Sequence, residues 1–291
     1  MEEKRAAFVG LGVMGFPMAG HLARQGWEVN VYNRSGHKAS NWVDLHKGRS
    51  FSSPRAASQH CEFVFTCVGN DDDLRSVVYG DEGVLAGLKK GATLIDHTTT
   101  SASVAREVSE VADGNGIAFL DAPVSGGQAG AENGVLTIMV GGKKEAFETA
   151  LPALKAYGKS ITYMGDSGNG QLAKMVNQIC IAGLVQALAE GLNFASLAGL
   201  DLSKVIEAIS GGAAQSWQMD NRARTMLKGE FDFGFAVDWM RKDLGFCLDE
   251  ANKNGALLPV TALVDEFYAD IQKKGGGRWD TSSLIENLRK N

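Results

Sequence analysis

Lys174 and Asn177 are polar residues in a long apolar stretch, GQLAKMVNQICIAGLVQALAEGLNFASLAGL, which begins at Gly170. In a helix, residues three positions apart lie on one face, so these two side chains would point the same way. Oxidation of a hydroxyl to a carbonyl needs a base for the hydroxyl proton, and the reverse reaction needs an acid. A partly desolvated lysine close to another positive charge has its pKa lowered from about 10.4 toward the working range, and the amide could orient the substrate oxygen. The alternative is a structural lysine whose stem packs while its ammonium reaches water, and the pair taken alone favours this alternative.

A glycine-rich turn near the N-terminus has the spacing of a dinucleotide-binding loop. Gly10, Gly12 and Gly15 follow an apolar segment at 6–10 and open a helical stretch at 14–24. Glycines at these positions let the backbone turn sharply and approach a pyrophosphate at the N-terminus of a helix. The spacing also occurs in tight turns without a ligand, but its strand–turn–helix context favours a nucleotide cofactor.

The segment after the second apolar strand selects the cofactor in sheets of this kind. An acidic residue there would bind the ribose hydroxyls of NAD, but this chain has Asn33, Arg34 and Ser35. Arg34 can pair with a 2′-phosphate, and its two neighbours can hydrogen-bond to one. The structural alternative is a solvated turn with an exposed arginine. These residues predict a preference for NADP, with the use of NAD left open.

Two further loops follow predicted strands, at the edge where ligands bind in such sheets. Cys67 and Val68 end the strand at 63–68 and are expected beneath the riboses of the cofactor. In the segment DHTTTS, Thr99 or Thr100 is expected near the nicotinamide. The same hydroxyls could instead cap the helix that follows, and the two interpretations are compatible.

A third loop, Ser125-Gly126-Gly127, comes shortly after the predicted strand at 117–121. A hydroxyl followed by two glycines exposes consecutive backbone N–H groups, and such a nest suits a carboxylate. An ordinary Pro/Gly turn is the alternative, since Pro123 lies just before it.

The predicted secondary structure that positions these residues changes along the chain, from alternating strands and helices to helices alone. Apolar strand candidates lie at 6–10, 28–32, 63–68, 93–96, 117–121 and 136–140, with helical stretches such as 14–24, 71–79, 101–113 and 143–156 between them. This alternation predicts an α/β fold with a doubly wound parallel sheet. After about residue 164 only helical stretches are expected, beginning with a long helix from about 171 to 198 and followed by stretches near 202–209, 216–227, 238–253, 260–273 and 282–290. We therefore predict a Rossmann-type NAD(P)-binding domain at 1–164 and an all-helical substrate and dimerisation domain at 165–291, joined by a long interdomain helix.

Composition narrows the classes of partner. The formal charge is −5, from 29 Lys and Arg against 34 Asp and Glu, which gives no support to a nucleic-acid or membrane-surface partner. Polar residues interrupt the long apolar stretch, so we do not expect it to span a membrane. No signal peptide is expected, and four scattered cysteines suit a reducing cytoplasm. The five histidines show no metal-ligand spacing, so no metal site is predicted.

The segments GLGVMGFPMAGHL, DAPVSGG and GNGQLAKMVNQ, in this order and spacing, strongly resemble the β-hydroxyacid dehydrogenases. That family includes 3-hydroxyisobutyrate dehydrogenase and tartronate-semialdehyde reductase and belongs to the 6-phosphogluconate dehydrogenase superfamily. The resemblance covers nearly the whole chain, including RKDL at 241–244 and the tail GGGRWDTSSLIENL. It implies these roles: a dinucleotide loop of Gly10, Gly12, Val13, Met14 and Gly15, cofactor contacts by Thr99 and Lys242, a carboxylate loop of Ser125, Gly126 and Gly127, the catalytic lysine Lys174 and the substrate-orienting Asn177.

The chain departs from the family pattern at two places. His97 and Thr98 replace the usual residues of the segment around Thr99, and we expect little consequence. Gln178 stands where many members have a second asparagine, and tartronate-semialdehyde reductases are similar to this chain there. Imine reductases share the scaffold but usually replace the lysine, and a non-catalytic dinucleotide sensor would lose the lysine or the loop. Both alternatives are therefore disfavoured by Lys174.

The sequence thus predicts an oxidoreductase that transfers a hydride between NADP(H), or NAD(H), and a short β-hydroxy acid or its semialdehyde. Imine or glyoxylate reduction on the same scaffold is the alternative activity. The expected partners are a small carboxylate substrate and further copies of the chain, in a homodimer or homotetramer. Candidate walls of the substrate pocket, which could equally be core or interface residues, are Ser216, Trp217, Met219, Asp220, Phe235 and Trp239.

Overall fold

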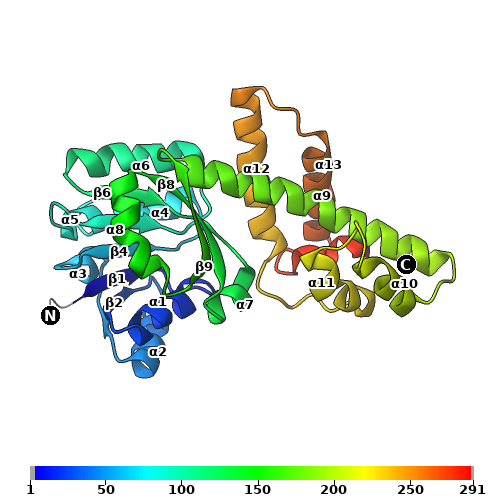
Figure 1. Cartoon of the computed structure of the whole chain (residues 1–291), viewed down its shortest axis with the longest axis horizontal. Coiled ribbons are helices and arrows are strands. Elements are labelled where there is room, and N and C mark those ends of the chain that lie inside the picture. Colours follow the sequence, from blue (N-terminus) through cyan, green and yellow to red (C-terminus); the bar gives the residue numbers. More distant parts are fainter. Residues whose placement is uncertain (1–3, 290–291) are drawn as a thin grey trace. The chain divides into compact units, whose positions relative to one another are not determined.

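The computed structural model describes residues 4–289 of the chain. By their contacts the residues divide into two compact units, Met1–Lys174 and Met175–Asn291. The division falls within one long helix, α9 (Asn169–Leu197). Figure 1 shows the strands gathered in the N-terminal unit and the C-terminal unit built from helices.

The N-terminal unit contains a nine-stranded sheet in the order β3-β2-β1-β4-β5-β6-β8-β7, with β9 paired to β8. The strands are β1 (Arg5–Val9), β2 (Glu28–Tyr32), β3 (Arg49–Ser50), β4 (Phe63–Thr66), β5 (Thr93–Asp96), β6 (Ala118–Asp121), β7 (Val124–Ser125), β8 (Leu136–Gly142) and β9 (Gly158–Gly165). The six strands from β3 to β6 in this order are parallel, whereas β8 runs antiparallel to both β6 and β7.

Helices cover both faces of this sheet because alternate residues of each central strand point to opposite sides. They are α1 (Gly15–Arg24), α2 (Gly36–His46), α3 (Pro54–Ser58), α4 (Asp71–Val78), α5 (Val84–Gly87), α6 (Ala102–Gly114), α7 (Gly127–Glu132) and α8 (Lys144–Leu154). Ala6 and Phe8 of β1 belong to a core with α1, α2, α7 and α8. Ala7 and Val9 belong to a second core with α3 to α6. This arrangement confirms the predicted doubly wound α/β fold.

Strands β3, β7 and β9 were not anticipated from the sequence. The two short ones contain two residues each, too few to show a period. In β9, GKSITYMG, exposed and half-buried residues alternate, so the strand lacks the continuous apolar run by which the central parallel strands were recognised. It pairs in parallel with β8, and that pairing alone makes it a strand.

Up to residue 289, the C-terminal unit is built from the remainder of α9 and five further helices. These are α10 (Leu202–Ser210), α11 (Trp217–Lys228), α12 (Val237–Asn254), α13 (Pro259–Lys273) and the 3-10 helix η1 (Thr281–Asn287). Their shared core includes Val185, Met226, Met240, Tyr268 and Leu284. The helical stretch expected at 282–290 is thus a 3-10 helix that ends at Asn287, and residue 290 lies outside the described residues.

Helix α9 is long and apolar enough to cross a membrane by length and composition, with a mean hydropathy of 1.4 in its most apolar window. In the structure 39% of that window is buried. Core helices of water-soluble proteins meet the same two criteria, so this composition fits a helix that contributes to the core.

Candidate active site

The glycine loop between β1 and α1 leaves room for a ligand at one of its three glycines. Gly10 has a φ of +99°, and a Cβ on it would lie 2.2 Å from Cys67 O. A Cβ on Gly15 would lie 2.0 Å from Gly10 O, whereas a Cβ on Gly12 would meet nothing within 4 Å. No described side chain caps α1, which begins directly after Met14. Two glycines are therefore needed for packing, and the third faces open space beside a helix N-terminus, as a pyrophosphate requires.

The segment after β2 is tied to this loop. Asn33 Oδ1 accepts a hydrogen bond of 2.8 Å from the backbone N–H of Leu11, and Asn33 Nδ2 donates to Ser35 O at 3.1 Å. The Arg34 side chain is 87% exposed, and its Nη1 lies 3.3 Å from Asp73 Oδ1. Asn33 therefore connects the segment after β2 to the glycine loop, and the next residue in that segment, Arg34, has an exposed guanidinium group.

A buried hydrogen-bond network joins the loops that follow β4 and β5. Asp96 Oδ1 accepts from Thr66 Oγ1 at 2.7 Å and from Thr98 Oγ1 at 2.6 Å, and Thr98 Oγ1 accepts from the N–H of Val68 at 3.0 Å. Burial raises the pKa of the Asp96 carboxyl from 3.8 to about 7, against the lowering effect of these hydrogen bonds. The network fixes the loop that carries Cys67 and Val68 against the loop that carries the half-buried Thr99.

His97, which departs from the family pattern, belongs to the core. Its Nδ1 lies 2.6 Å from the carbonyl oxygen of Ala122, and its Nε2 lies 2.8 Å from the hydroxyl of Tyr157. Since a carbonyl only accepts, Nδ1 carries the proton and Nε2 accepts from the tyrosine hydroxyl. Burial lowers the pKa of His97 from 6.5 to about 4, so the ring is neutral at pH 7. The ring also stacks on Phe65, with centroids 5.8 Å apart.

The carboxylate loop predicted at 125–127 contains two glycines in left-handed conformations. Gly126 has a φ of +131° and Gly127 a φ of +62°, which L side chains rarely adopt. Ser125 is half-buried at the end of β7, and both glycines are exposed at the start of α7, where Gly126 is the N-cap and Gly127 the first helical residue. His21 of α1 holds the other end of α7, with Nε2 3.0 Å from the carbonyl oxygens of Ala131 and Glu132. The loop therefore leads into a helix that is anchored at its far end.

Lys174 lies on α9 at the end of the N-terminal unit and is 7% exposed. A lysine whose ammonium reaches water would be more exposed, so the burial does not fit the alternative weighed from the sequence. Asn177 is half-buried three residues further along the same helix. The structure thus places both residues on one helix at the spacing that the sequence predicted.

Asn177 begins a polar network that the sequence did not reveal. Its Nδ2 donates to Gln178 Oε1 at 2.7 Å, and Gln178 Nε2 donates to Asp243 Oδ2 at 2.6 Å. Asp243 Oδ1 in turn lies 3.2 Å from Lys242 Nζ, which stands over the rings of Trp239 and Phe246. Gln178 therefore links Asn177, the predicted substrate-orienting residue, to Lys242, the predicted cofactor lysine, within the C-terminal unit. The sequence signals for it were a polar amide in an apolar helix and the departure of Gln178 from the family pattern.

A second polar network holds the start of α9 in the N-terminal unit. The carboxylate of Asp121, at the end of β6, accepts from the backbone N–H groups of Gly168 and Gln171 at 2.8 and 2.9 Å. The Gln171 side chain donates to Thr98 O at 2.7 Å and accepts from the N–H of Thr100 at 3.1 Å. Neither Asp121 nor Gln171 was assigned a role from the sequence.

Two of the candidate pocket-wall residues have structural tasks. Ser216 caps α11 by accepting from the N–H of Met219 at 3.1 Å, and Met219 is buried in the helical core. Trp217 and Trp239 are partly exposed, and the ring of Trp217 stacks against the Arg222 guanidinium.

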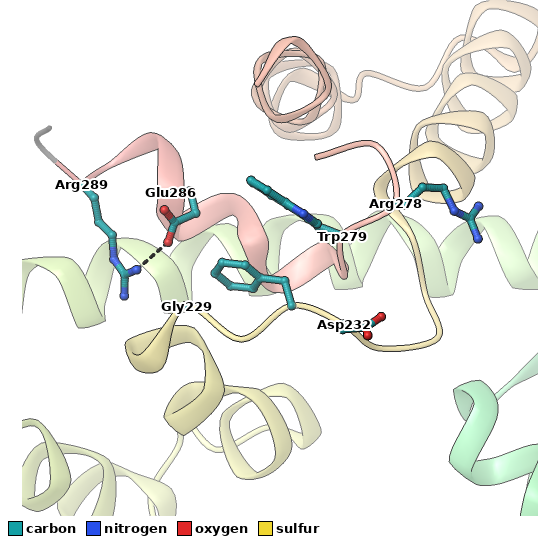
Figure 2. Close-up of a pocket in the computed structure, with 7 residues that line it drawn as sticks. Gly229, Asp232, Arg278, Trp279, Glu286 and Arg289 are labelled. Atoms are coloured by element: carbon teal, nitrogen blue, oxygen red, sulfur yellow. Dashed lines mark hydrogen bonds and ion pairs between the residues drawn. The ribbon is translucent and has the colours of Figure 1, made fainter. Parts of the chain in front are cut away.

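A hollow of about 500 Å³ in the C-terminal unit contains none of the predicted site residues (Figure 2). It is lined by Gly229, Phe231, Asp232, Arg278, Trp279, Glu286 and Arg289. Arg289 pairs with Glu286 at 2.6 Å. It also donates to the carbonyl oxygens of Met226 and Leu227 and so supplies hydrogen bonds to the last turn of α11. Figure 2 shows the Arg278 side chain pointing away from Trp279. Arg289 and Glu286 therefore stabilise the local fold. Between residues 4 and 289, no three His, Cys, Asp or Glu side chains are grouped as a metal site.

Comparison with known proteins agrees with this geometry. The profile of the NAD binding domain of 6-phosphogluconate dehydrogenase matches residues 5–165, and that of the NAD-binding domain of NADP-dependent 3-hydroxyisobutyrate dehydrogenase matches 168–288. The chain is 61% identical to an oxidoreductase of Shewanella frigidimarina over 98% of both chains. It is 36% identical to the 2-hydroxy-3-oxopropionate reductase of Escherichia coli, over 98% of this chain and 97% of that protein. A structure of 3-hydroxyisobutyrate dehydrogenase from Mycobacterium tuberculosis, with L-serine, superposes with a TM-score of 0.89 at 30% identity over 99% of both chains. The family predicted from the motifs is confirmed: the chain belongs to the β-hydroxyacid dehydrogenases and is an NAD(P)-dependent oxidoreductase.

Proposed function

We propose that this protein catalyses reversible hydride transfer between NADP(H) and a short β-hydroxy acid or its semialdehyde, with Lys174 as the general acid and base. The observation that carries the proposal is the burial of Lys174, about one turn beyond the start of α9. Gln171, in the first turn of the same helix, is hydrogen-bonded to the Thr98–Thr100 loop. That loop follows the carboxyl end of β5, the edge at which cofactors bind in parallel sheets.

The residues of the glycine loop fit a dinucleotide. The open space beside Gly12 and the uncapped start of α1 provide backbone N–H groups for a pyrophosphate, with Val13 and Met14 beside them. Arg34 supports a preference for NADP because its exposed guanidinium can pair with a 2′-phosphate. Asn33 contributes mainly by holding Arg34 and Ser35 in place, since its oxygen already accepts from Leu11. The bound nicotinamide supplies or accepts the hydride.

The substrate carboxylate is assigned to Ser125, Gly126 and Gly127. Both glycines are exposed and have positive φ angles, which suits a nest of successive backbone amides, and the serine hydroxyl adds a further donor. The reductase of Escherichia coli is named for 2-hydroxy-3-oxopropionate, a short carboxylate with an aldehyde. A substrate of this class would place its carboxylate on the loop and its reacting oxygen toward Lys174.

In the oxidation direction, Lys174 Nζ accepts the proton of the substrate hydroxyl as the hydride leaves the same carbon. In the reduction direction, the protonated amine returns that proton to the new alkoxide oxygen. Asn177 orients the oxygen, and its bond to Gln178 fixes the amide for this task. Lys242, held by Asp243, is assigned to the cofactor.

We also propose a homodimer or homotetramer in the cytoplasm. Phe194 and Leu197 at the end of α9 are each 73% exposed, and apolar side chains of this size are commonly covered by a second copy. The four cysteines form no disulfide, which suits a reducing compartment.

The decisive experiment measures oxidation of NADPH and NADH with tartronate semialdehyde, succinic semialdehyde, methylmalonate semialdehyde and glyoxylate. With the best substrate, Lys174→Ala should lower kcat about 10²- to 10⁴-fold, the usual contribution of general acid–base catalysis. Lys144→Ala, on the exposed surface of α8, is the matched control and should keep full activity. Full activity of Lys174→Ala would show that another group moves the proton.

A further inference from the structure

Both carboxylate oxygens of Asp121 accept hydrogen bonds from backbone N–H groups at the beginning of α9. Oδ1 accepts from the N–H of Gly168 at 2.8 Å, and Oδ2 accepts from the N–H of Gln171 at 2.9 Å. The side chain is fully buried. A carboxylate at this position also interacts favourably with the positive end of the helix dipole. The sequence DAPVSGG therefore begins with an anion that faces α9, before it reaches the carboxylate loop.

The surrounding glycines show how closely the helix start lies against the sheet. A Cβ on Gly170 would lie 2.5 Å from both Asp121 O and Met139 O, and a Cβ on Gly141 would lie 2.5 Å from Asp121 Oδ1. Real Cβ atoms essentially never come so close to backbone or carboxylate oxygens. The first turn of α9 is thus in direct contact with β6 and β8 and has no room to shift toward them.

Gln171 fixes the same turn from a second direction. Its side chain is fully buried and bridges the loop after β5, donating to Thr98 O at 2.7 Å and accepting from the N–H of Thr100 at 3.1 Å. Lys174 lies three residues further on the same helix and in the same unit. The side chains of Gln171 and Lys174 therefore share one helix face.

The hydrogen-bond donors around position 121 favour a carboxylate there over a neutral side chain of the same shape. Burial raises the pKa of Asp121 to about 6, while the N–H groups of Gly168, Gln171 and Gly170 act in the opposite direction. The carboxyl of Asp96, its partner in the β5–β6 register, is the other acidic group beside it. A neutral amide could fill the same space, but it cannot accept from two N–H groups with two oxygens.

We infer that Asp121 and Gln171 are positioning residues for the reaction, which together hold the first turn of α9 so that Lys174 stands at a fixed place relative to the Thr98–Thr100 loop. This inference rests on the proposed role of Lys174 as acid and base. The two residues act through the lysine and touch neither substrate nor cofactor in this scheme. A displacement of about 1 Å at a reacting group costs roughly 100-fold in rate, so the effect of loosening this turn is measurable.

The test uses the full-length enzyme and the variant Asp121→Asn, which keeps the shape but turns an N–H₂ group toward one of the two backbone N–H donors. The kcat should fall about 10- to 100-fold, while the dissociation constant for NADPH, measured by fluorescence titration, stays within about twofold. Gln171→Met, which removes both bonds to the loop at similar volume, should do the same and serves if Asp121→Asn folds poorly. Val84→Ala, in the buried core of α5, is the control for lost stability: it should lower the melting temperature and leave kcat unchanged.

A double-mutant cycle separates positioning from general stability. If Asp121 acts through Lys174, then Asp121→Asn should lower kcat by less than about twofold in the Lys174→Ala background. The inference is overturned if Asp121→Asn and Gln171→Met keep the wild-type kcat, or if the two losses in the double variant multiply in full. Full activity of Lys174→Ala would instead overturn the proposed function, and the inference with it, so the two failures are distinguishable.

Discussion

Replacing Asp96 by asparagine should remove a pH-dependent loss of stability that this buried carboxyl imposes on the N-terminal unit. Asp96 ends β5 and is fully buried. Its Oδ1 accepts from Thr66 and Thr98, but its Oδ2 is buried and has no hydrogen-bond partner among the described residues. Asparagine has the same shape and retains the accepting oxygen, so the substitution removes the charge with little change in packing.

The magnitude follows from the pKa of Asp96, which burial raises from 3.8 to about 7. Because the folded protein holds this proton more tightly than the unfolded chain, the associated stability is complete below pH 3.8 and is lost as the pH rises through about 7. Between pH 5 and about 7 the loss is about 1.4 kcal/mol per pH unit, which gives about 3 kcal/mol by pH 8. His97 acts in the opposite sense, since burial lowers its pKa from 6.5 to about 4 and stability falls as the pH drops through this range. That contribution is common to both proteins and cancels in their difference.

The assay is urea unfolding followed by circular dichroism at pH 5 and pH 8 for the wild type and Asp96→Asn. Relative to the wild type, the free energy of unfolding of Asp96→Asn should be about 3 kcal/mol higher at pH 8 than at pH 5. Asp44→Asn, exposed on α2, is the control for loss of a carboxylate without burial and should follow the wild type. A difference between Asp96→Asn and the wild type that is independent of pH would refute the reasoning, because the folded and unfolded states would then bind this proton equally.

Two further predictions concern the cofactor loop. Gly12→Ala should leave the melting temperature nearly unchanged, because its Cβ would meet nothing within 4 Å, yet weaken NADPH binding about tenfold or more by blocking a charge-assisted hydrogen bond. Gly15→Ala should lower the melting temperature itself, because its Cβ would lie 2.0 Å from Gly10 O, and equal melting of the two variants would contradict the assignment. Arg34→Ala should raise the KM for NADPH about tenfold or more with little change for NADH, while Asp73→Asn should lower the KM for NADPH by releasing the guanidinium that it pairs with at 3.3 Å. Initial rates with both cofactors test this pair, and parallel changes for NADPH and NADH would exclude recognition of a 2′-phosphate.

The fold was largely predictable because its strongest signals are local. A strand–glycine loop–helix order and a run of short apolar strands need only neighbouring residues to be recognised. Helix α11 illustrates the same point, with Ser216 before it and Gly229 after it in the left-handed conformation. Strand β9 escaped notice because its exposed residues show no buried face, and its identity depends on pairing with β8.

The candidate site was predictable in its residue types but not in its supports. Lys174, Asn177 and the 125–127 loop carry chemistry that can be inferred from type and spacing. Gln178 could not be interpreted in this way, because its partner Asp243 lies 65 residues further along the chain. Arg34 was expected to meet a phosphate, and only the fold shows Asp73 beside it.

By itself, the sequence determined the family, the order of the helices and of the central strands, and the residues that we propose bind the dinucleotide, hold the carboxylate and move the proton. The tertiary structure decided how these side chains are held. It set His97 against Tyr157, Asp121 against the start of α9, and Gln171 across the loop after β5. The physical reason is that a buried polar group must find a partner wherever the chain brings one, and these partners come from strands and loops far apart in sequence. Periodicity and spacing report only the near neighbours of a residue, whereas burial and hydrogen bonding at a site depend on the distant ones.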